Sequence, residues 1–209
     1  MSRLVVVAPH PDDEVLTAGG LMRQRFAGDV IVVAVTDGEA SHAQSTRISP
    51  EDLRTRRDAE RAEALRRLGV TARVIRLGAP DQGCRGASDD IAASLAGLLR
   101  HGDTVIGPSR ADRHPDHVAV ADALRRAAAG VVGTVWEAPT WALVHGERPP
   151  PSCTLELDAA GWRAKRHAMD AYVSQLTPLG PDPVDGPVVH PGELATMLRP
   201  CEEFLAVEV

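Results

Sequence analysis

The sequence is poor in lysine. Lys165 is the single lysine among 23 basic residues, so arginine carries nearly all of the positive charge, which we attribute to genome composition. Acidic residues number 29, which gives a net charge of -6 and an isoelectric point of about 5.7. Proteins that bind nucleic acids in general present a basic surface. The charge balance therefore excludes general nucleic-acid binding from the expected functions.

Cysteine is also scarce, and long hydrophobic runs are absent. Cys84, Cys153 and Cys201 form no CxxC pair, and an odd number without a secretory signal predicts reduced thiols in a cytoplasmic protein. The apolar run near the N-terminus is too short for a signal peptide or a membrane span. With no internal repeat, the 209 residues predict one domain, 1–209, in which 178–191 form a surface loop rich in proline and glycine.

An apolar run that ends in a polar cluster dominates the N-terminus, Val5-Val6-Val7-Ala8-Pro9-His10-Pro11-Asp12-Asp13-Glu14. The run predicts a buried first strand, and open α/β sheets bind ligands at the carboxyl ends of their strands. His10 and Asp13 are good ligands for a metal such as zinc, and Asp12 between them is left free for proton transfer. For Asp13 alone, a simple helix cap is the alternative interpretation. The histidine in the string favours a functional cluster, because no cap requires it.

Strand-like and helix-like segments alternate along the chain. Such alternation predicts an α/β fold with a mostly parallel sheet, helices on both faces and the common strand order 3-2-1-4-5. We expect Ser49 and Gly69 to bound the second helix, Asp116 to cap the fourth, and the glycine pair 19–20 to allow close packing. The expected strands are 4–8, 30–35, 72–77, 104–107, 131–137, 153–157 and, at an edge, 204–207; the expected helices are 13–26, 50–68, 89–100, 117–129 and 160–176.

A second polar cluster, His114-Pro115-Asp116-His117, follows the fourth predicted strand. In the expected topology strands one and four are neighbours, so both clusters face one crevice. His10, Asp13 and one later histidine would make the three-ligand set of a catalytic zinc, which lowers the pKa of a bound water to about 7. The remaining histidine would polarise a carbonyl or protonate a leaving amine, held in one tautomer by Asp116. Surface or cap positions are the alternative for each histidine.

Residues 8–14 and 114–118 resemble the two signature stretches of the PIG-L (LmbE-like) deacetylases. The resemblance implies a Rossmann-like α/β fold and metal-dependent hydrolysis of N-acyl groups, usually on glucosamine-type sugars. It makes His10, Asp13 and His117 the zinc ligands and Asp12 the general base. It makes His114 the electrophilic or acid histidine, with Asp116 behind it.

Weaker similarities to this family continue along the chain. Arg57 lies where the family has a substrate-contacting arginine and Asp81 where it has a sugar-binding aspartate; a solvated helix face is the alternative for Arg57. Trp141, after the fifth predicted strand, would stack on a sugar ring or belong to the core. Asp112 replaces a tyrosine found in some thiol-pathway members, and the long C-terminal extension of those members is lacking, which argues against a mycothiol-type substrate. Further matches are Glu60, Ala64, Leu68-Gly69, Lys165, Ala168, Ser174 and Gln175.

The expected function is therefore hydrolysis of an N-acetyl group on a small amino sugar or sugar conjugate, with Zn²⁺ or another divalent ion such as Fe²⁺ as cofactor. An amidase that acts on a non-sugar amide is the alternative within enzymes. A binding protein without turnover is disfavoured, because neither Asp12 nor any of the expected metal-ligand residues is missing. A two-metal phosphatase is also disfavoured, because its site needs more bridging carboxylates than the sequence supplies. The expected partner is a small-molecule N-acyl amine. Assembly into a homo-oligomer is compatible with the sequence.

Overall fold

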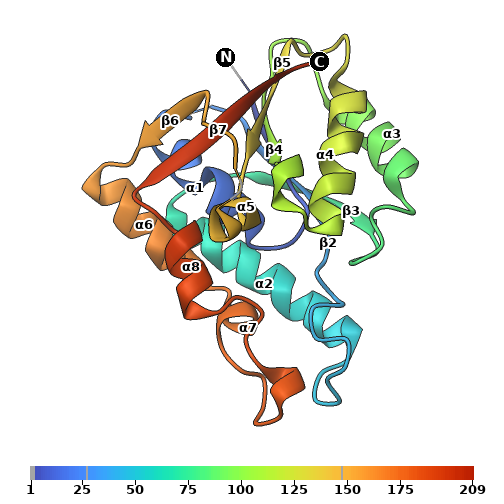
Figure 1. The fold of residues 1–209 in the computed structure, drawn as a ribbon, viewed down its shortest axis with the longest axis vertical. Coiled ribbons are helices and arrows are strands. Elements are labelled where there is room, and N and C mark those ends of the chain that lie inside the picture. Colours follow the sequence, from blue (N-terminus) through green and yellow to red (C-terminus); the bar gives the residue numbers. More distant parts are fainter. Residues whose placement is uncertain (1–2, 27, 147) are drawn as a thin grey trace.

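A computed structural model describes residues 3–26, 28–146 and 148–209, which build a seven-stranded sheet (Figure 1). The strand order β3-β2-β1-β4-β5-β7-β6 contains the predicted order 3-2-1-4-5. The first five strands are parallel, and β7 runs antiparallel to both β5 and β6. The strands are β1 (Leu4–Ala8), β2 (Val30–Thr36), β3 (Arg73–Ala79), β4 (Thr104–Pro108), β5 (Thr134–Ala138), β6 (Cys153–Glu156) and β7 (Cys201–Glu208).

Helices cover both faces of the sheet, as the alternating pattern predicted (Figure 1). The longer helices are α1 (Asp13–Arg25), α2 (Pro50–Leu68) and α6 (Ala159–Met169) on one face, and α3 (Ser88–Leu98) and α4 (Pro115–Ala128) on the other. Shorter helices are α5 (Trp141–His145), α7 (Val173–Leu176) and α8 (Pro191–Met197), with 3₁₀ turns η1 (Arg110–Asp112) and η2 (Pro183–Asp185). Among the described residues, no helix has the length and apolarity needed to cross a membrane.

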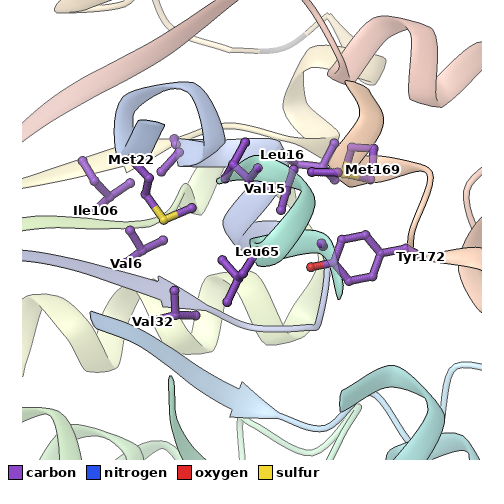
Figure 2. Packing of buried hydrophobic residues seen from close by; sticks show 14 of the residues in the cluster. Val6, Val15, Leu16, Met22, Val32, Leu65, Ile106, Met169 and Tyr172 are labelled. Atoms are coloured by element: carbon purple, nitrogen blue, oxygen red, sulfur yellow. The ribbon is translucent and has the colours of Figure 1, made fainter. Parts of the chain in front are cut away.

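Strand β1 divides the core in two, because successive side chains of a strand point to opposite faces. Leu4 and Val6 belong to the cluster beneath α1, α2 and α6, whereas Val5 and Val7 belong to the cluster beneath α3 and α4. Figure 2 shows the first cluster, in which Met22 and Val15 of α1 lie over Val6 and Val32. A central strand that is buried on both faces holds the loop after it in a fixed position.

The predicted boundaries of α2 are confirmed. Ser49 accepts a hydrogen bond from the Asp52 amide at 3.1 Å, and Gly69 ends the helix with φ of +73°. The glycine pair also allows the predicted close packing, because a Cβ at Gly20 would lie 2.2 Å from Leu157 Cδ2. Leu157 follows β6, so this contact joins α1 to the far end of the sheet.

Three local predictions are wrong. The segment 160–176 is not one helix, because the chain turns between α6 and α7 to place Tyr172 in the core. Strand β7 is not at an edge but pairs on both sides, with β6 as the edge strand. Helix α4 begins at Pro115 with His114 as its N-cap, so Asp116 does not cap it. The first two outcomes depend on distant contacts, which a local pattern does not contain. The third follows from Pro115 at the first helical position and the hydrogen bond that His114 accepts from the Asp116 amide.

Candidate active site

The two polar clusters meet at the carboxyl ends of β1 and β4, which are neighbours in the sheet. His10 follows β1, His114 follows β4 and η1, and His117 lies in the first turn of α4. The ring centroids of the three histidines are 5.0 to 5.4 Å apart. The expected convergence of both clusters in one crevice is therefore what the fold produces.

Asp13 lies between two imidazoles. Its Oδ2 atom is 3.4 Å from His10 Nδ1 and 3.3 Å from His117 Nε2. Within the described residues, the buried His117 Nε2 atom has no hydrogen-bond partner, which is costly for a polar atom. An ion bound by these three atoms would satisfy it, and two imidazoles with one carboxylate suit zinc or a similar divalent ion. The residues present therefore fit the implied metal.

A second arrangement of donors is also compatible with a metal. Ring nitrogens of His10, His114 and His117 lie within 4.8 Å of one another, and so do ligand atoms of His10, Asp81 and Asp116. His10 is common to both groups and faces Asp13 with one nitrogen and Asp116 with the other. A ligating histidine ordinarily gives its second nitrogen to a carboxylate, so the Asp116 contact suits His10 as a metal ligand.

The surrounding carboxylates favour positive charge on two imidazoles. Burial by itself lowers the pKa of His117, but Asp13 and Asp112 outweigh it and raise that pKa to about 9. Burial also lowers the pKa of His10, but Asp116, Asp13 and Asp81 outweigh this effect. The pKa of His10 therefore lies well above its usual range. A divalent ion would take the place of these protons, because metal ligands must be deprotonated.

Asp116 contacts two of the histidines through different atoms. Its Oδ2 atom lies 3.1 Å from His10 Nε2 and accepts a hydrogen bond from the Gln82 amide at 2.8 Å. Its Oδ1 atom accepts from the Cys84 amide at 3.1 Å. The Asp116 carboxylate, in the first turn of α4, points across the crevice toward the loop after β1 and contacts His10. Asp116 contacts the His114 ring through its backbone amide instead. That Asp116 holds His114 in one tautomer stays a prediction.

His117 is held by a carboxylate that the sequence analysis had noted only as a departure from the family pattern. This residue is Asp112, which is 1 % exposed, and its Oδ2 atom lies 2.8 Å from His117 Nδ1. Its Oδ1 atom accepts from the amides of Thr140 (2.8 Å) and Ala142 (3.1 Å), at the start of α5. The signal available in the sequence was an aspartate five residues before a histidine, in the loop after a strand.

Asp112 both accepts from the amides at the start of α5 and contacts His117, and replacement by asparagine is expected to separate these two contacts. The amide oxygen can still accept from Thr140 and Ala142, whereas the amide nitrogen would face His117 Nδ1 as a second donor. We expect metal affinity to fall roughly 10- to 100-fold, the usual cost of losing such a carboxylate. A competition titration against a chromophoric zinc chelator measures this. Unchanged zinc affinity would contradict the role given to Asp112.

Asp12 has an unusual backbone conformation, with φ of +133° and ψ of -32°. Non-glycine residues rarely adopt this region, and such strain is found mainly at functional sites. The side chain is buried but lines the pocket, and burial raises its pKa to about 7, with Asp13 adding to the effect and Arg57 and His10 opposing it. A carboxylate with this pKa can both accept and release a proton at neutral pH.

His114 has the predicted extended backbone before Pro115, with φ of -67° and ψ of +127°. Its Nδ1 atom accepts a hydrogen bond from the Asp116 amide at 3.3 Å, which leaves the proton on Nε2. Burial, His117 and His10 lower the pKa of His114 to about 4. The lowered pKa favours a neutral His114 that donates a hydrogen bond through Nε2.

The predicted substrate residues line the same pocket as the catalytic candidates. Arg57 is 2 % exposed and donates to Pro11 O (2.7 Å) and Gly38 O (3.0 Å), so the solvated-face alternative is wrong. Asp81 accepts from the Ala40 amide at 2.8 Å, and Trp141 begins α5 at the pocket wall. The 178–191 segment is more than a surface loop, because Val188 and Val189 also line the pocket.

Comparison with known proteins agrees with this geometry. Residues 5–128 match the PIG-L family, described as GlcNAc-PI de-N-acetylase, which is more than half of the chain and contains both polar clusters. The chain belongs to the PIG-L family. No curated protein sequence matches it significantly.

Solved structures related to this PIG-L chain share its fold over nearly the full length. The conserved protein TT1542 from Thermus thermophilus is 28 % identical with a TM-score of 0.68, covering 100 % of this chain and 96 % of that one. N,N'-diacetylchitobiose deacetylase from Pyrococcus horikoshii is 19 % identical with a TM-score of 0.70 and coverages of 99 % and 84 %. GalB, a 4-carboxy-2-hydroxymuconate hydratase from Pseudomonas putida KT2440, is 19 % identical with a TM-score of 0.68 and coverages of 100 % and 97 %. The last two show the fold alone, which evidently hosts more than one reaction.

Proposed function

We propose that this PIG-L protein is a zinc-dependent hydrolase that removes the N-acetyl group from a small amino sugar or sugar conjugate. The observation that carries the proposal is the position of Asp12, a strained carboxylate with a pKa of about 7, beside the donor atoms of His10, Asp13 and His117. The family description and the chitobiose deacetylase of the same fold support an N-acetyl amino sugar as the substrate class. Fe²⁺ is a second candidate for the metal.

The residues of the pocket divide the chemistry of amide hydrolysis between them. A divalent ion held by His10, Asp13 and His117 would supply Lewis acidity and lower the pKa of a bound water to about 7. Asp12 takes a proton from the attacking water and can return it to the nitrogen of the leaving amine. His114, protonated on Nε2, donates a hydrogen bond to the carbonyl oxygen as negative charge develops there.

The rest of the pocket supplies binding groups. Arg57, Asp81 and Gln82 offer donors and acceptors suited to sugar hydroxyls, and Trp141 offers an aromatic face for a pyranose ring. These residues come from three separate elements, α2, the loop after β3 and α5. A sugar bound among them would be oriented by contacts remote from the amide bond, which is how enzymes position a reacting group.

The proposal is tested by assaying the zinc-loaded protein against a panel of N-acetyl sugars, their glycosides and N-acetylated peptides, with amine and acetate release measured together. We expect turnover of at least one amino sugar, about one zinc per chain, and loss of activity after prolonged chelation. Adding zinc back should restore activity. Full activity in a preparation verified to be metal-free would contradict the metal-dependent mechanism.

A second candidate is an amidase for a non-sugar amide. The pocket lining also includes apolar side chains, namely Leu16, Val188, Val189, Met197 and Trp141. These side chains favour an apolar group somewhere in the substrate, because hydroxyls facing them would lose their hydrogen bonds. The same panel distinguishes the candidates, since preference for acylated peptides or aryl amides over every sugar would favour the amidase.

A further inference from the structure

Tyr172 is the single tyrosine of the chain, and it lies fully buried where the chain turns between α6 and α7. Figure 2 shows its ring reaching into the core cluster with the hydroxyl oxygen directed inward. The hydroxyl donates a short hydrogen bond to Glu14 Oε1, and Glu14 is itself fully buried. Neither residue lines the pocket as Asp12 does, so their contact needs another explanation than substrate binding.

Glu14 connects this tyrosine to the candidate base. Its second oxygen, Oε2, accepts a hydrogen bond from the backbone amide of Asp12 at 3.2 Å. A carboxylate that bonds with both oxygens is fixed at two points, so Tyr172 determines where the acceptor for the Asp12 amide lies. The hydroxyl stays protonated, because burial and the Glu14 charge hold the pKa of Tyr172 well above its ordinary value.

The Asp12 conformation needs such support. A non-glycine residue at φ of +133° is strained and persists only where the surroundings impose it. Arg57 of α2 donates to Pro11 O at 2.7 Å and lies 3.5 Å from Asp12 Oδ2. Glu14 accepts from the Asp12 amide. Two buried side chains therefore hold the carbonyl and the amide of the peptide unit that precedes Asp12.

We propose that Tyr172 and Glu14 are positioning residues for catalysis, which fix the backbone of Asp12 so that its carboxylate points at the attacking water. This inference rests on the proposed function in assigning Asp12 the role of base. Small displacements of a reacting group are expensive, and loss of the Tyr172 hydroxyl leaves Glu14 Oε1 unpaired and free to move. The effect should therefore appear in turnover and not in substrate binding.

The test compares Tyr172→Phe, Glu14→Gln and the double variant in the zinc-loaded protein. Tyr172→Phe should lower kcat roughly 10- to 100-fold with little change in KM, the pattern of a displaced catalytic group. Glu14→Gln should retain most of kcat, because its amide oxygen still accepts from Asp12 and its amide nitrogen can donate to Tyr172. In the double variant that nitrogen has no acceptor, so kcat should fall to the level of Tyr172→Phe.

Two controls separate positioning from a general loss of stability. Ile91→Ala creates a cavity in the α3–α4 core, away from the site, and should destabilise the protein without lowering kcat. Zinc content should equal that of the parent protein in every variant. Parental kcat in Tyr172→Phe would overturn the proposal, and so would a rise in KM at unchanged kcat, or a decrease in kcat matched by Ile91→Ala at equal stability.

A measurement without substrate distinguishes failure of this inference from failure of the proposed function. Backbone amide hydrogen exchange at Asp12, resolved by NMR, should be slow in the parent and in Glu14→Gln and accelerated in Tyr172→Phe. The amides of Val15 and Leu16, which bond to Asp12 O at 3.0 Å, serve as internal references. If no N-acetyl sugar is hydrolysed but exchange at Asp12 responds as expected, the proposed activity fails and the structural support of Asp12 stands. Exchange that does not change in Tyr172→Phe overturns the inference.

Discussion

Asp12→Asn is expected to lower kcat by roughly 10²-fold or more, the usual contribution of a positioned base. Asparagine keeps the shape of the side chain but cannot accept the proton of the attacking water. Metal binding should persist, because Asp12 is not among the three proposed ligands. Stability should not decrease, since burial raises the pKa of Asp12 to about 7 and the ionised carboxylate is therefore stabilised less in the folded chain than in the unfolded one.

The measurements are steady-state kinetics, zinc content and the thermal midpoint of Asp12→Asn. Asp90→Asn, at an exposed position in α3, is the matched control and should behave as the parent protein. Normal turnover by Asp12→Asn would show that another residue takes the proton. Loss of zinc from this variant would instead place Asp12 among the metal ligands.

The second large effect concerns the two histidines of the second cluster. His117→Ala should lose metal affinity and, with it, activity, because His117 Nε2 faces Asp13 Oδ2 at 3.3 Å. His114→Ala should keep zinc and lose roughly 10²- to 10³-fold in kcat, the cost of one donor to a developing oxyanion. Since a neutral His114 already carries its proton on Nε2, this loss should be similar from about pH 6 to 8, well above its lowered pKa of about 4.

The N-cap role of His114 calls for a second substitution. His114 Nδ1 accepts from the Asp116 amide, so alanine also removes a cap of about 0.5–2 kcal/mol. His114→Asn retains a cap and should show the same loss of kcat with less destabilisation. His101→Ala, in an exposed turn, is the neutral control. If zinc is lost from His114→Ala and retained by His117→Ala, the assignments of the two histidines are reversed. If zinc is lost from both variants, the three-histidine donor group is the better description of the site.

Local sequence patterns were sufficient for the main elements and their order. The apolar β-branched runs at 4–8 and 30–35, the capping residues Ser49 and Gly69, and the alternation of strands with helices predicted β1, β2, α2 and the order β3-β2-β1-β4-β5. That order places the loops after β1 and β4 side by side, so the sequence also predicted that His10 and His117 would share a crevice. These predictions succeed because periodicity, capping and crossover handedness act over a few residues or follow from simple topology.

The pairing of side chains within the site was decided by the tertiary structure. The Asp116 carboxylate contacts His10 while the Asp116 amide contacts His114, Asp112 holds His117, and burial lowers the pKa of His114. Each outcome depends on ångström-scale distances between segments up to about a hundred residues apart, and on desolvation, neither of which a residue pattern contains.

Contacts between segments far apart in the chain were likewise decided by the tertiary structure, whereas the position of the site in the sheet was predictable from the sequence. The sequence determined by itself that His10, Asp12, Asp13 and His117 lie at the carboxyl edge of a parallel sheet, because the strand ends are local properties and the alternation of strands and helices predicts the common strand order. Only the folded chain brings Tyr172 to Glu14, 158 residues away, Arg57 to Pro11, and Val188 and Val189 to the pocket. The physical reason is that buried polar groups must find partners wherever packing places them, and those partners come from whichever segment fills the adjacent space.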